Sequence, residues 1–221
     1  MDDPLVEADG QQAPGWGWAD LHGWHVLRPL LDAGGFLPWS EGAMSPAGLA
    51  RVATEISFAE RRVVVELGSG ISTVVLARLA RELSGTLISV EHLPEWAGWV
   101  RRALQRDGLG TVATVLEAPL RPHPLALGGA PWYAEDALSA LPDEGIELLL
   151  VDGPPGYGAG MARSRYPALP LLADRLAPGA LVVLDDAGRE GEAEILDRWE
   201  AELGFAFDRR VPERIAVGRR S

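Results

Sequence analysis

The 221-residue sequence contains no cysteine, no long apolar run and no excess of basic residues. The lack of cysteine excludes disulfides, thiolate metal sites and a cysteine nucleophile. Without an apolar run long enough to span a bilayer, or a basic-then-apolar leader, we expect a cytoplasmic protein with no membrane partner. The net charge of −12, from 32 acidic and 20 basic residues, repels phosphate backbones. We therefore expect no nucleic-acid partner.

The length suits a single α/β domain, and no shift in composition marks a second one. Residues 1–15 are polar, acidic and patternless, which predicts a mobile tail. Residues 16–58 are expected to form an N-terminal helical cap and acceptor region. This cap is expected to be continuous with an α/β domain over residues 59–221.

Four of the eight tryptophans, Trp16, Trp18, Trp24 and Trp39, lie close together in the predicted cap. They suit two roles, because an aromatic ring can pack a helix onto a sheet or wall a ligand pocket. In the first role they would hold a helix over about residues 20–33 against the sheet. In the second, Trp39 would contact the acceptor. A second helix is predicted to start at Pro46.

Residues 63–73, Val-Val-Val-Glu-Leu-Gly-Ser-Gly-Ile-Ser-Thr, predict a buried strand, a tight turn and a helix. Gly68 and Gly70 allow the backbone to approach a ligand closely, and the N–H groups at the helix start favour an anion. This pattern predicts that a nucleotide-like ligand binds at the turn. The dinucleotide fingerprint requires a third glycine where Thr73 stands, so the pattern fails for nicotinamide cofactors. A purely structural turn is the alternative.

Later strands also end on acids. Strands are predicted over residues 86–91, 111–117, 146–152 and 180–186, and acids close them at Glu91, Glu117, Asp152 and Asp185-Asp186. Ligands of open α/β sheets bind beyond the carboxyl ends of the strands, where these acids lie. Between the last two strands we expect a helix carrying Tyr166, Leu169, Leu172 and Leu176. The stretch 121–131 is expected to be a Pro- and Gly-rich loop.

Six motifs follow one another over about residues 39–205. They are Glu-Leu-Gly-Ser-Gly-Ile-Ser-Thr at 66–73, Val-Glu-His at 90–92, Ala-Pro-Leu at 118–120, Trp-Tyr at 132–133, Val-Asp-Gly-Pro-Pro-Gly at 151–156 and Leu-Asp-Asp-Ala-Gly-Arg at 184–189. This order resembles class I S-adenosylmethionine-dependent methyltransferases, in particular a bacterial branch similar to small-molecule O-methyltransferases. The resemblance implies a Rossmann-like α/β fold. Its sheet would be mostly parallel and seven-stranded, with helices on both faces and an antiparallel C-terminal hairpin.

The resemblance also implies which residues bind S-adenosyl-L-methionine. The glycine turn would lie under the methionine part, Glu91 would accept the ribose hydroxyls, and the backbone near Ala118 would read the adenine edge. The full set of expected cofactor contacts is Glu66, Gly68, Ser69, Gly70, Ser72, Thr73, Glu91, His92, Ala118, Pro119 and Asp152. Trp132 and Tyr133 would either stack on the adenine or pack as a lid over the sheet edge.

The predicted reaction transfers a methyl group to a small-molecule acceptor, and a hydroxyl oxygen is the expected site of methylation. Asp152 and Asp185 are the expected catalytic residues, because such an acceptor must lose its proton. Together with Asp186 they could hold Mg²⁺, as in similar metal-dependent O-methyltransferases. In the alternative, Asp186 caps the next helix and Asp152 acts without metal.

Three arginines, Arg163, Arg165 and Arg189, are expected near the same mouth. Arg163 and Arg189 could hold an acidic acceptor, or the arginines could neutralise the aspartates. An aminopropyl transferase of the same fold, a nicotinamide oxidoreductase and a non-catalytic nucleoside-binding domain are the rival functions. A homodimer is compatible with the sequence, which does not specify the oligomeric state.

Overall fold

Five parallel strands form the centre of the sheet in the computed structural model, which describes residues 17–40, 42–209 and 214–221. The predicted tail over residues 1–15 lies outside the described residues. In chain order the five strands are β1 (Val63–Leu67), β2 (Thr86–Glu91), β3 (Ala113–Glu117), β6 (Ile146–Val151) and β7 (Leu176–Leu184). Each is rich in aliphatic residues, as expected for strands that are buried on both faces.

Two antiparallel strands complete the sheet at its C-terminal side. They are β8 (Phe205–Asp208) and β9 (Ala216–Arg220), and β9 lies between β7 and β8. Within the described residues, the sheet has seven strands in the order β3-β2-β1-β6-β7-β9-β8. The predicted fold, a mostly parallel seven-stranded sheet with an antiparallel C-terminal hairpin, is confirmed. The strand order reverses between β1 and β6, which makes their carboxyl ends the topological switch point.

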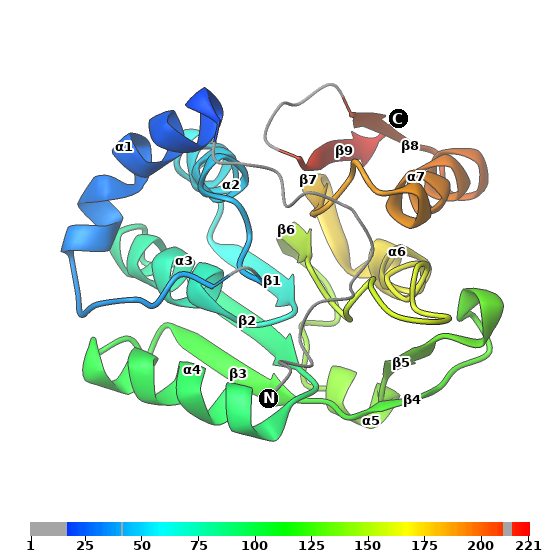
Figure 1. Ribbon diagram of the computed structural model, residues 1–221, viewed down its shortest axis with the longest axis horizontal. Coiled ribbons are helices and arrows are strands. Elements are labelled where there is room, and N and C mark those ends of the chain that lie inside the picture. Colours follow the sequence, from blue (N-terminus) through cyan, green and yellow to red (C-terminus); the bar gives the residue numbers. More distant parts are fainter. Residues whose placement is uncertain (1–16, 41, 210–213) are drawn as a thin grey trace, which may run out of the picture.

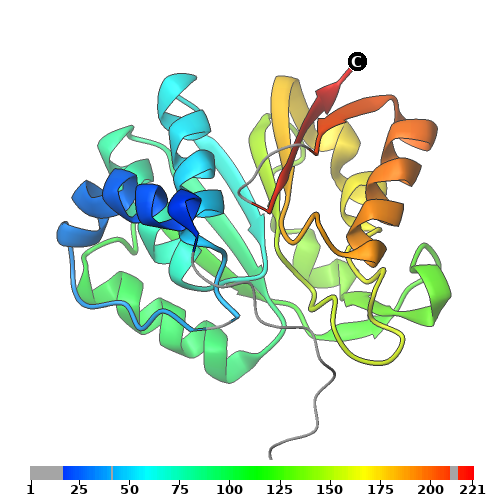
Figure 2. The same ribbon diagram turned by 45° about the horizontal axis from the view of Figure 1, so that its top comes forward.

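Helices cover both faces of the sheet (Figures 1 and 2). One face carries α1 (Trp18–Asp32), α2 (Pro46–Phe58), α3 (Ile71–Glu82) and α4 (Pro94–Arg106). The other face carries α5 (Glu135–Leu138), α6 (Ala168–Leu172) and α7 (Glu190–Leu203). The two hydrophobic cores therefore lie on opposite sides of the same strands, and the carboxyl ends of the strands remain open to a ligand.

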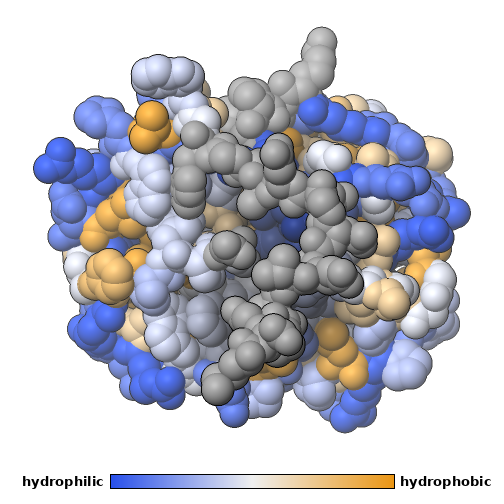
Figure 3. Space-filling view, viewed as in Figure 1, coloured by the Kyte–Doolittle hydropathy of each residue, from blue (hydrophilic) through white to orange (hydrophobic). Residues whose placement is uncertain are grey.

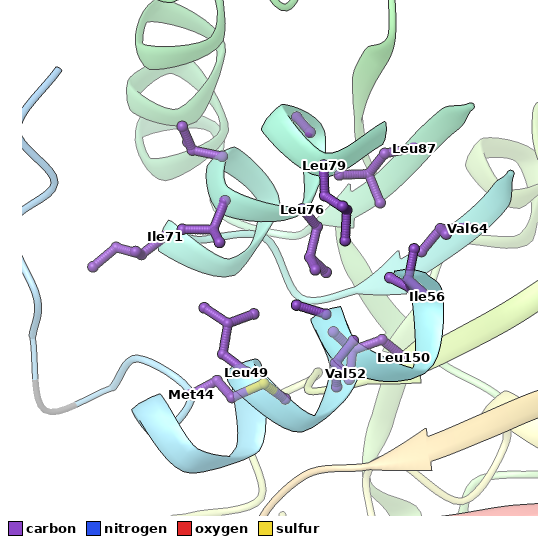
Figure 4. Close-up of a cluster of buried hydrophobic side chains, with 14 of the residues drawn as sticks. Met44, Leu49, Val52, Ile56, Val64, Ile71, Leu76, Leu79, Leu87 and Leu150 are labelled. Atoms are coloured by element: carbon purple, nitrogen blue, oxygen red, sulfur yellow. The ribbon is translucent and has the colours of Figure 1, made fainter. Parts of the chain in front are cut away.

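Alternation along the strands divides the apolar side chains between these two cores. In β1, Val64 faces the core under α2 and α3, and Val65 faces the core under α6 and α7. Figure 4 shows part of the first core, where Leu49 and Val52 of α2 lie opposite Leu76 of α3. This packing fixes the start of α3, and with it the glycine turn that precedes the helix.

Helices α1 and α2 occupy the predicted cap and pack against each other and against α3. Trp24 of α1 and Trp39 lie with their ring centroids 4.4 Å apart. Ser45 caps α2, since its hydroxyl accepts a hydrogen bond from the Gly48 N–H at 3.0 Å. Both predicted helices are present, and the first begins at Trp18, two residues before the predicted start.

The predicted helix through Leu176 is wrong. Helix α6 covers only residues 168–172, a 3₁₀ turn covers residues 173–175, and Leu176 is the first residue of β7. The apolar spacing is helical, but Pro170 has no N–H to donate to the carbonyl of Tyr166, which prevents the helix from including Tyr166. Likewise, the ends of the predicted loop 121–131 lie in a short antiparallel pair, β4 (Leu120–Pro122) and β5 (Pro131–Tyr133).

No helix in the described part of the chain is both long and apolar enough to cross a membrane. The face shown in Figure 3 is ringed by hydrophilic residues, and the hydrophobic residues appear as separate patches. Scattered apolar side chains of this kind are normal on a protein surface.

Candidate active site

A cavity of about 300 Å³ opens at the carboxyl ends of β1, β2, β6 and β7, on the switch point of the sheet. Its wall joins two groups of residues that the sequence analysis singled out. The glycine turn, Glu91 and His92 line one part, and Asp152, Asp185, Asp186 and Arg189 line the other. Open α/β sheets bind their ligands at this position.

The glycine turn is shaped by its neighbour on β6. Gly68 has a φ of +92°, and a Cβ built on it would lie 2.8 Å from the carbonyl oxygen of Asp152. Any residue with a side chain would adopt this φ only with strain, and its Cβ would clash with the backbone of Asp152. Ser69, Gly70 and Ser72 follow directly and line the cavity. The turn thus exposes backbone to a ligand, as the sequence predicted.

Glu66 lies beneath the turn and is completely buried. Its carboxylate accepts hydrogen bonds from the hydroxyls of Ser72 at 2.6 Å, Thr73 at 2.5 Å and Ser89 at 2.7 Å. Burial raises the pKa of Glu66 to about 7, and the three hydroxyl donors only partly offset this effect. Glu66 and Thr73 are outside the set of residues that line the cavity. Their direct contact with a cofactor therefore stays a prediction, and their visible role is to hold α3 against β1.

Replacing Glu66 with glutamine is expected to change how stability depends on pH. The pKa of Glu66 rises from 4.5 to about 7 on folding, so its stabilising contribution is lost as the pH rises through about 7. Glutamine does not titrate. Relative to wild type, the free energy of unfolding of Glu66→Gln should therefore gain roughly 2 kcal/mol between pH 5.5 and pH 8. Denaturant unfolding of the ligand-free protein measures this, with the exposed Glu82→Gln as control. Parallel pH curves for Glu66→Gln and wild type would contradict the expectation.

Glu91 joins the glycine turn to the end of β2. One carboxylate oxygen accepts from the backbone N–H and the hydroxyl of Ser69, both at 3.1 Å. The other accepts from the N–H groups of His92 and Leu93, both at 2.8 Å. Burial alone would raise the pKa of Glu91, but the hydrogen bonds from His92, Leu93 and Ser69 hold it below its ordinary value. Glu91 is therefore a fixed, ionised acceptor on the cavity wall.

Trp96 is a residue of this wall that the sequence analysis did not identify as a site residue. Its indole N–H donates to the carbonyl of Ser69 at 2.7 Å, and its ring stacks on Trp99 with centroids 4.9 Å apart. Trp96 also lines the cavity. The sequence does show a tryptophan in the first turn of the helix after Glu91, which could have indicated a site residue. Its hydrogen-bond partner is the backbone carbonyl of Ser69, however, and a pattern of side chains cannot reveal such a contact.

Substituting Trp96 by phenylalanine is expected to weaken S-adenosylhomocysteine binding about three- to tenfold, because the turn loses the hydrogen bond that fixes the Ser69 carbonyl. Trp99→Phe is the matched control, since Trp99 stacks on Trp96 but lies outside the cavity wall. Isothermal titration of both variants gives the comparison. Equal weakening by the two substitutions would show that only the ring stack matters.

The three aspartates predicted at the strand ends come together. Ligand oxygens of Asp152, Asp185 and Asp186 all lie within 4.8 Å of one another. Adjacent residues of a strand point to opposite faces, so Asp185 and Asp186 can share a site only if the chain bends. Asp186 has a φ of +58°, which provides that bend. The alternative role of Asp186 as a helix cap is not observed, because Arg189 is the N-cap residue of α7.

Arg165 lies within the acidic cluster and is almost completely buried. Its guanidinium donates to the backbone carbonyls of Pro154 at 3.1 Å, Asp185 at 3.0 Å and Asp152 at 3.1 Å. It also bridges the carboxylates of Asp152 and Asp186, each at 3.2 Å. Of the two roles weighed for the arginines, Arg165 therefore neutralises aspartates and ties the ends of β6 and β7 together.

Charge in this cluster is not balanced by the described residues. Four carboxylates, those of Asp152, Asp185, Asp186 and Glu192, face the two guanidiniums of Arg165 and Arg189. Burial and the neighbouring carboxylates raise the pKa of Asp152 well above its ordinary value and that of Asp185 to about 6. A group that carries positive charge would relieve this repulsion.

Some predicted residues lie away from the cavity. Arg163 pairs with Glu194 at 2.9 Å, and Trp39 packs against Trp24. Ala118 is buried, and its N–H donates to the Glu91 carbonyl at 2.8 Å. Four of the predicted site residues do not line the cavity: Arg163, Trp39, Ala118 and Pro119. Arg189 does line it. Contacts of these residues with a cofactor or an acceptor stay predictions.

A ligand cavity at the switch point of a sheet of this topology is typical of nucleotide-binding α/β enzymes. The sequence matches the family described as "Methyltransferase domain" over residues 65–187, which is more than half of the chain. The chain belongs to this methyltransferase family. The match confirms the prediction of a class I S-adenosylmethionine-dependent methyltransferase. No curated protein matches the sequence.

Several solved structures, two of them described as O-methyltransferases, share the fold. Cofactor-bound Rv0187 from MTB is 20% identical with a TM-score of 0.62, and the similarity covers 98% of this chain and 92% of that one. The O-methyltransferase of Bacillus cereus in complex with SAH is 16% identical with a TM-score of 0.60, covering 97% and 92%. TomG of Streptomyces achromogenes, an O-methyltransferase of tomaymycin synthesis in complex with SAM, is 16% identical with a TM-score of 0.59, covering 99% and 92%. At these identities the likeness establishes the fold.

Proposed function

We propose that this protein transfers the methyl group of S-adenosylmethionine to a hydroxyl oxygen of a small-molecule acceptor. The observation that carries the proposal is the single cavity at the switch point, whose wall contains both the glycine turn with Glu91 and the three aspartates. The first group suits a nucleoside, and the second suits the handling of a proton. A ligand that spans the cavity would bring its reactive centre to the aspartates.

The cofactor would lie across the ends of β2, β1 and β6. Glu91 stays ionised, so it can accept hydrogen bonds from the ribose hydroxyls. Ser69 and Gly70 would present backbone to the methionine part, and Trp96 would hold that turn in place. The Bacillus and Streptomyces structures are complexes with SAH and SAM, which supports the same cofactor here.

Methyl transfer from a sulfonium is an in-line displacement, so the protein must mainly align donor and acceptor. A hydroxyl acceptor must also lose its proton, and a carboxylate beside it can take that proton. Asp152 and Asp185 line the cavity and are the candidates for this step. Oxygen as the methylated atom is supported by these acids and by the O-methyltransferases among the similar structures.

A divalent ion such as Mg²⁺ fits the donor set, because the oxygens of Asp152, Asp185 and Asp186 converge and the cluster carries excess negative charge. When bound, the ion would lower the pKa of an acceptor hydroxyl. The three aspartates would hold it, and Arg165 would keep the two strand ends in register through its bonds to backbone carbonyls. Arg189, at the rim, could instead contact an acidic acceptor.

Calorimetric titration tests the proposed cofactor. We expect S-adenosylmethionine and S-adenosylhomocysteine to bind, and decarboxylated S-adenosylmethionine and the nicotinamide nucleotides to bind at least tenfold more weakly, because the glycine turn is matched to an amino-acid group. Preference for the decarboxylated form would favour an aminopropyl transferase. Binding of the nicotinamide nucleotides alone would contradict the proposal. Release of S-adenosylhomocysteine over a panel of hydroxylated small molecules then identifies the acceptor class.

A further inference from the structure

Tyr133 carries a buried hydroxyl whose place in the site is not explained by the internal packing. The residue is 1% exposed, and its hydroxyl has no hydrogen-bond partner among the described residues. Of the six buried side-chain polar atoms without a partner in the described part of the chain, this is the one that belongs to a cavity-lining residue. Leaving a buried hydroxyl unpaired is costly, so such a group calls for a specific explanation.

The hydroxyl lies at the switch point itself. A Cβ built on Gly153 would be 2.3 Å from the Tyr133 hydroxyl and 2.8 Å from the Cα of Gly68. Gly153 follows β6 and Gly68 follows β1, so the hydroxyl is beside the junction of the two strands whose order reverses. The lack of a side chain at Gly153 is what leaves room for it.

The ring of Tyr133 is held in this direction by its own strand. Tyr133 pairs with Leu120 in the short β4–β5 sheet, and its ring packs edge-on against Trp132 with centroids 5.1 Å apart. On the cavity side its centroid is 6.5 Å from that of His92. The ring of Tyr133 therefore lies next to His92 on the cavity wall, and its hydroxyl is beside the junction of β1 and β6.

Burial raises the pKa of Tyr133 well above its ordinary value, and the nearby carboxylates of Glu91 and Asp152 act in the same direction. The group therefore keeps its proton and is a hydrogen-bond donor. Ring nitrogens and sugar oxygens of a nucleoside accept hydrogen bonds, so a protonated hydroxyl is a suitable partner for them, whereas ionised Glu91 can only accept.

We infer that the Tyr133 hydroxyl binds the cofactor by donating a hydrogen bond to its nucleoside part. This inference rests on the proposed cofactor and adds a contact to it. It differs from the stacking role that the sequence left open for the Trp-Tyr pair, because the contact is polar and is made by one atom. Trp132 is fully buried and lies outside the cavity wall, so it packs beneath Tyr133.

The test is Tyr133→Phe, titrated with S-adenosylhomocysteine and with 5′-methylthioadenosine, which keeps the nucleoside but lacks the amino-acid group. We expect the Kd for both to rise about three- to tenfold. The thermal midpoint of the ligand-free variant should stay equal to that of wild type or increase, because an unpaired hydroxyl has been removed. Lower affinity with undiminished stability is a combination that a purely structural role would not produce.

Tyr166→Phe is the matched control, because the Tyr166 hydroxyl already donates to Glu202 and lies outside the cavity wall. Its affinity for both ligands should equal that of wild type. Unchanged Kd values for Tyr133→Phe, as expected if water alone satisfies the hydroxyl, would overturn the inference. A loss confined to S-adenosylhomocysteine would also overturn it, since it would move the contact to the amino-acid part. Failure of the wild-type protein to bind either ligand would instead refute the proposed cofactor.

Discussion

Asp185→Asn is expected to lower methyl transfer at least a hundredfold while the Kd for S-adenosylhomocysteine stays within about threefold of wild type. The substitution keeps the shape of the side chain but removes its charge and its ability to take a proton. Asp185 is buried in the cavity wall beside Asp152 and Asp186, and it follows β7, whereas the glycine turn follows β1. Rate and affinity should therefore separate, and single-turnover assays with calorimetry on the same preparations measure both.

Two controls make the Asp185 result specific. Asp174→Asn removes the charge of a fully exposed aspartate that pairs with Arg220 on the surface, and it should leave the rate unchanged. Chelation with EDTA followed by Mg²⁺ addition separates the two roles of Asp185. If Mg²⁺ takes part, chelation should lower the wild-type rate and added Mg²⁺ should restore it. Activity that persists under chelation would contradict a role for Mg²⁺ in the reaction. The aspartates would then accept the proton without a metal. An active Asp185→Asn variant would contradict both roles.

Arg78→Leu is expected to lower the free energy of unfolding by about 3–5 kcal/mol. Arg78 is fully buried in α3, and its guanidinium pairs with Asp107 and donates to the carbonyls of Leu30, Leu31 and Gly35. Burial alone would raise the pKa of Asp107, but hydrogen bonds from Arg106 and Arg78 lower it to about 2. Without Arg78, the buried carboxylate of Asp107 keeps Arg106 and the Gly35 N–H but loses its buried cation, and three carbonyls lose the guanidinium donor. Denaturant unfolding at pH 7 measures the loss.

Arg28→Leu provides the comparison, because Arg28 and Asp32 form an ion pair between side chains about 70% exposed. Such pairs contribute between zero and about 1 kcal/mol. The double variant Arg78→Leu/Asp107→Asn should be less destabilised than the sum of its single variants, since no charge is then buried alone. Equal effects of Arg78→Leu and Arg28→Leu would show that the α1–α3 contact does not depend on the buried pair.

The part of the site that could be predicted from sequence is the part built by single strands and their turns. The aliphatic run before Gly68 and the acid at the end of β2 are local patterns, so the positions of the glycine turn and Glu91 followed from spacing alone. The resemblance to a family then implied a mostly parallel seven-stranded sheet with an antiparallel C-terminal hairpin. Asp185 and Asp186 share a site only because Asp186 has a positive φ, and no sequence pattern specifies that backbone angle. From sequence, the shared metal site was therefore only one of two alternatives for Asp186.

What could not be predicted depends on contacts between side chains and distant backbone. Arg165 was one of three arginines near the cavity, and nothing local distinguishes it from Arg163, which pairs with Glu194 outside the cavity wall. Trp96 acts on the carbonyl of a residue 27 positions earlier. The helix at Leu169 and Leu172 was predicted, but its end was misplaced because the leucine spacing continues helically to Leu176, where β7 begins. In each case contacts between distant parts of the chain determine the role of the residue or the length of the helix. The local sequence pattern contains little information about such contacts.

The guanidinium of Arg165 has a consequence for altering the acceptor range by protein engineering. Because it joins the ends of β6 and β7 through three backbone carbonyls and also pairs with the carboxylate of Asp152, a substitution at Asp152 would remove an ion pair of the scaffold together with the chemistry. Tyr157 and Arg189 border the same cavity from the rim and carry exposed side chains. A focused mutant library at these two positions would vary the entrance while the strand junction remains intact.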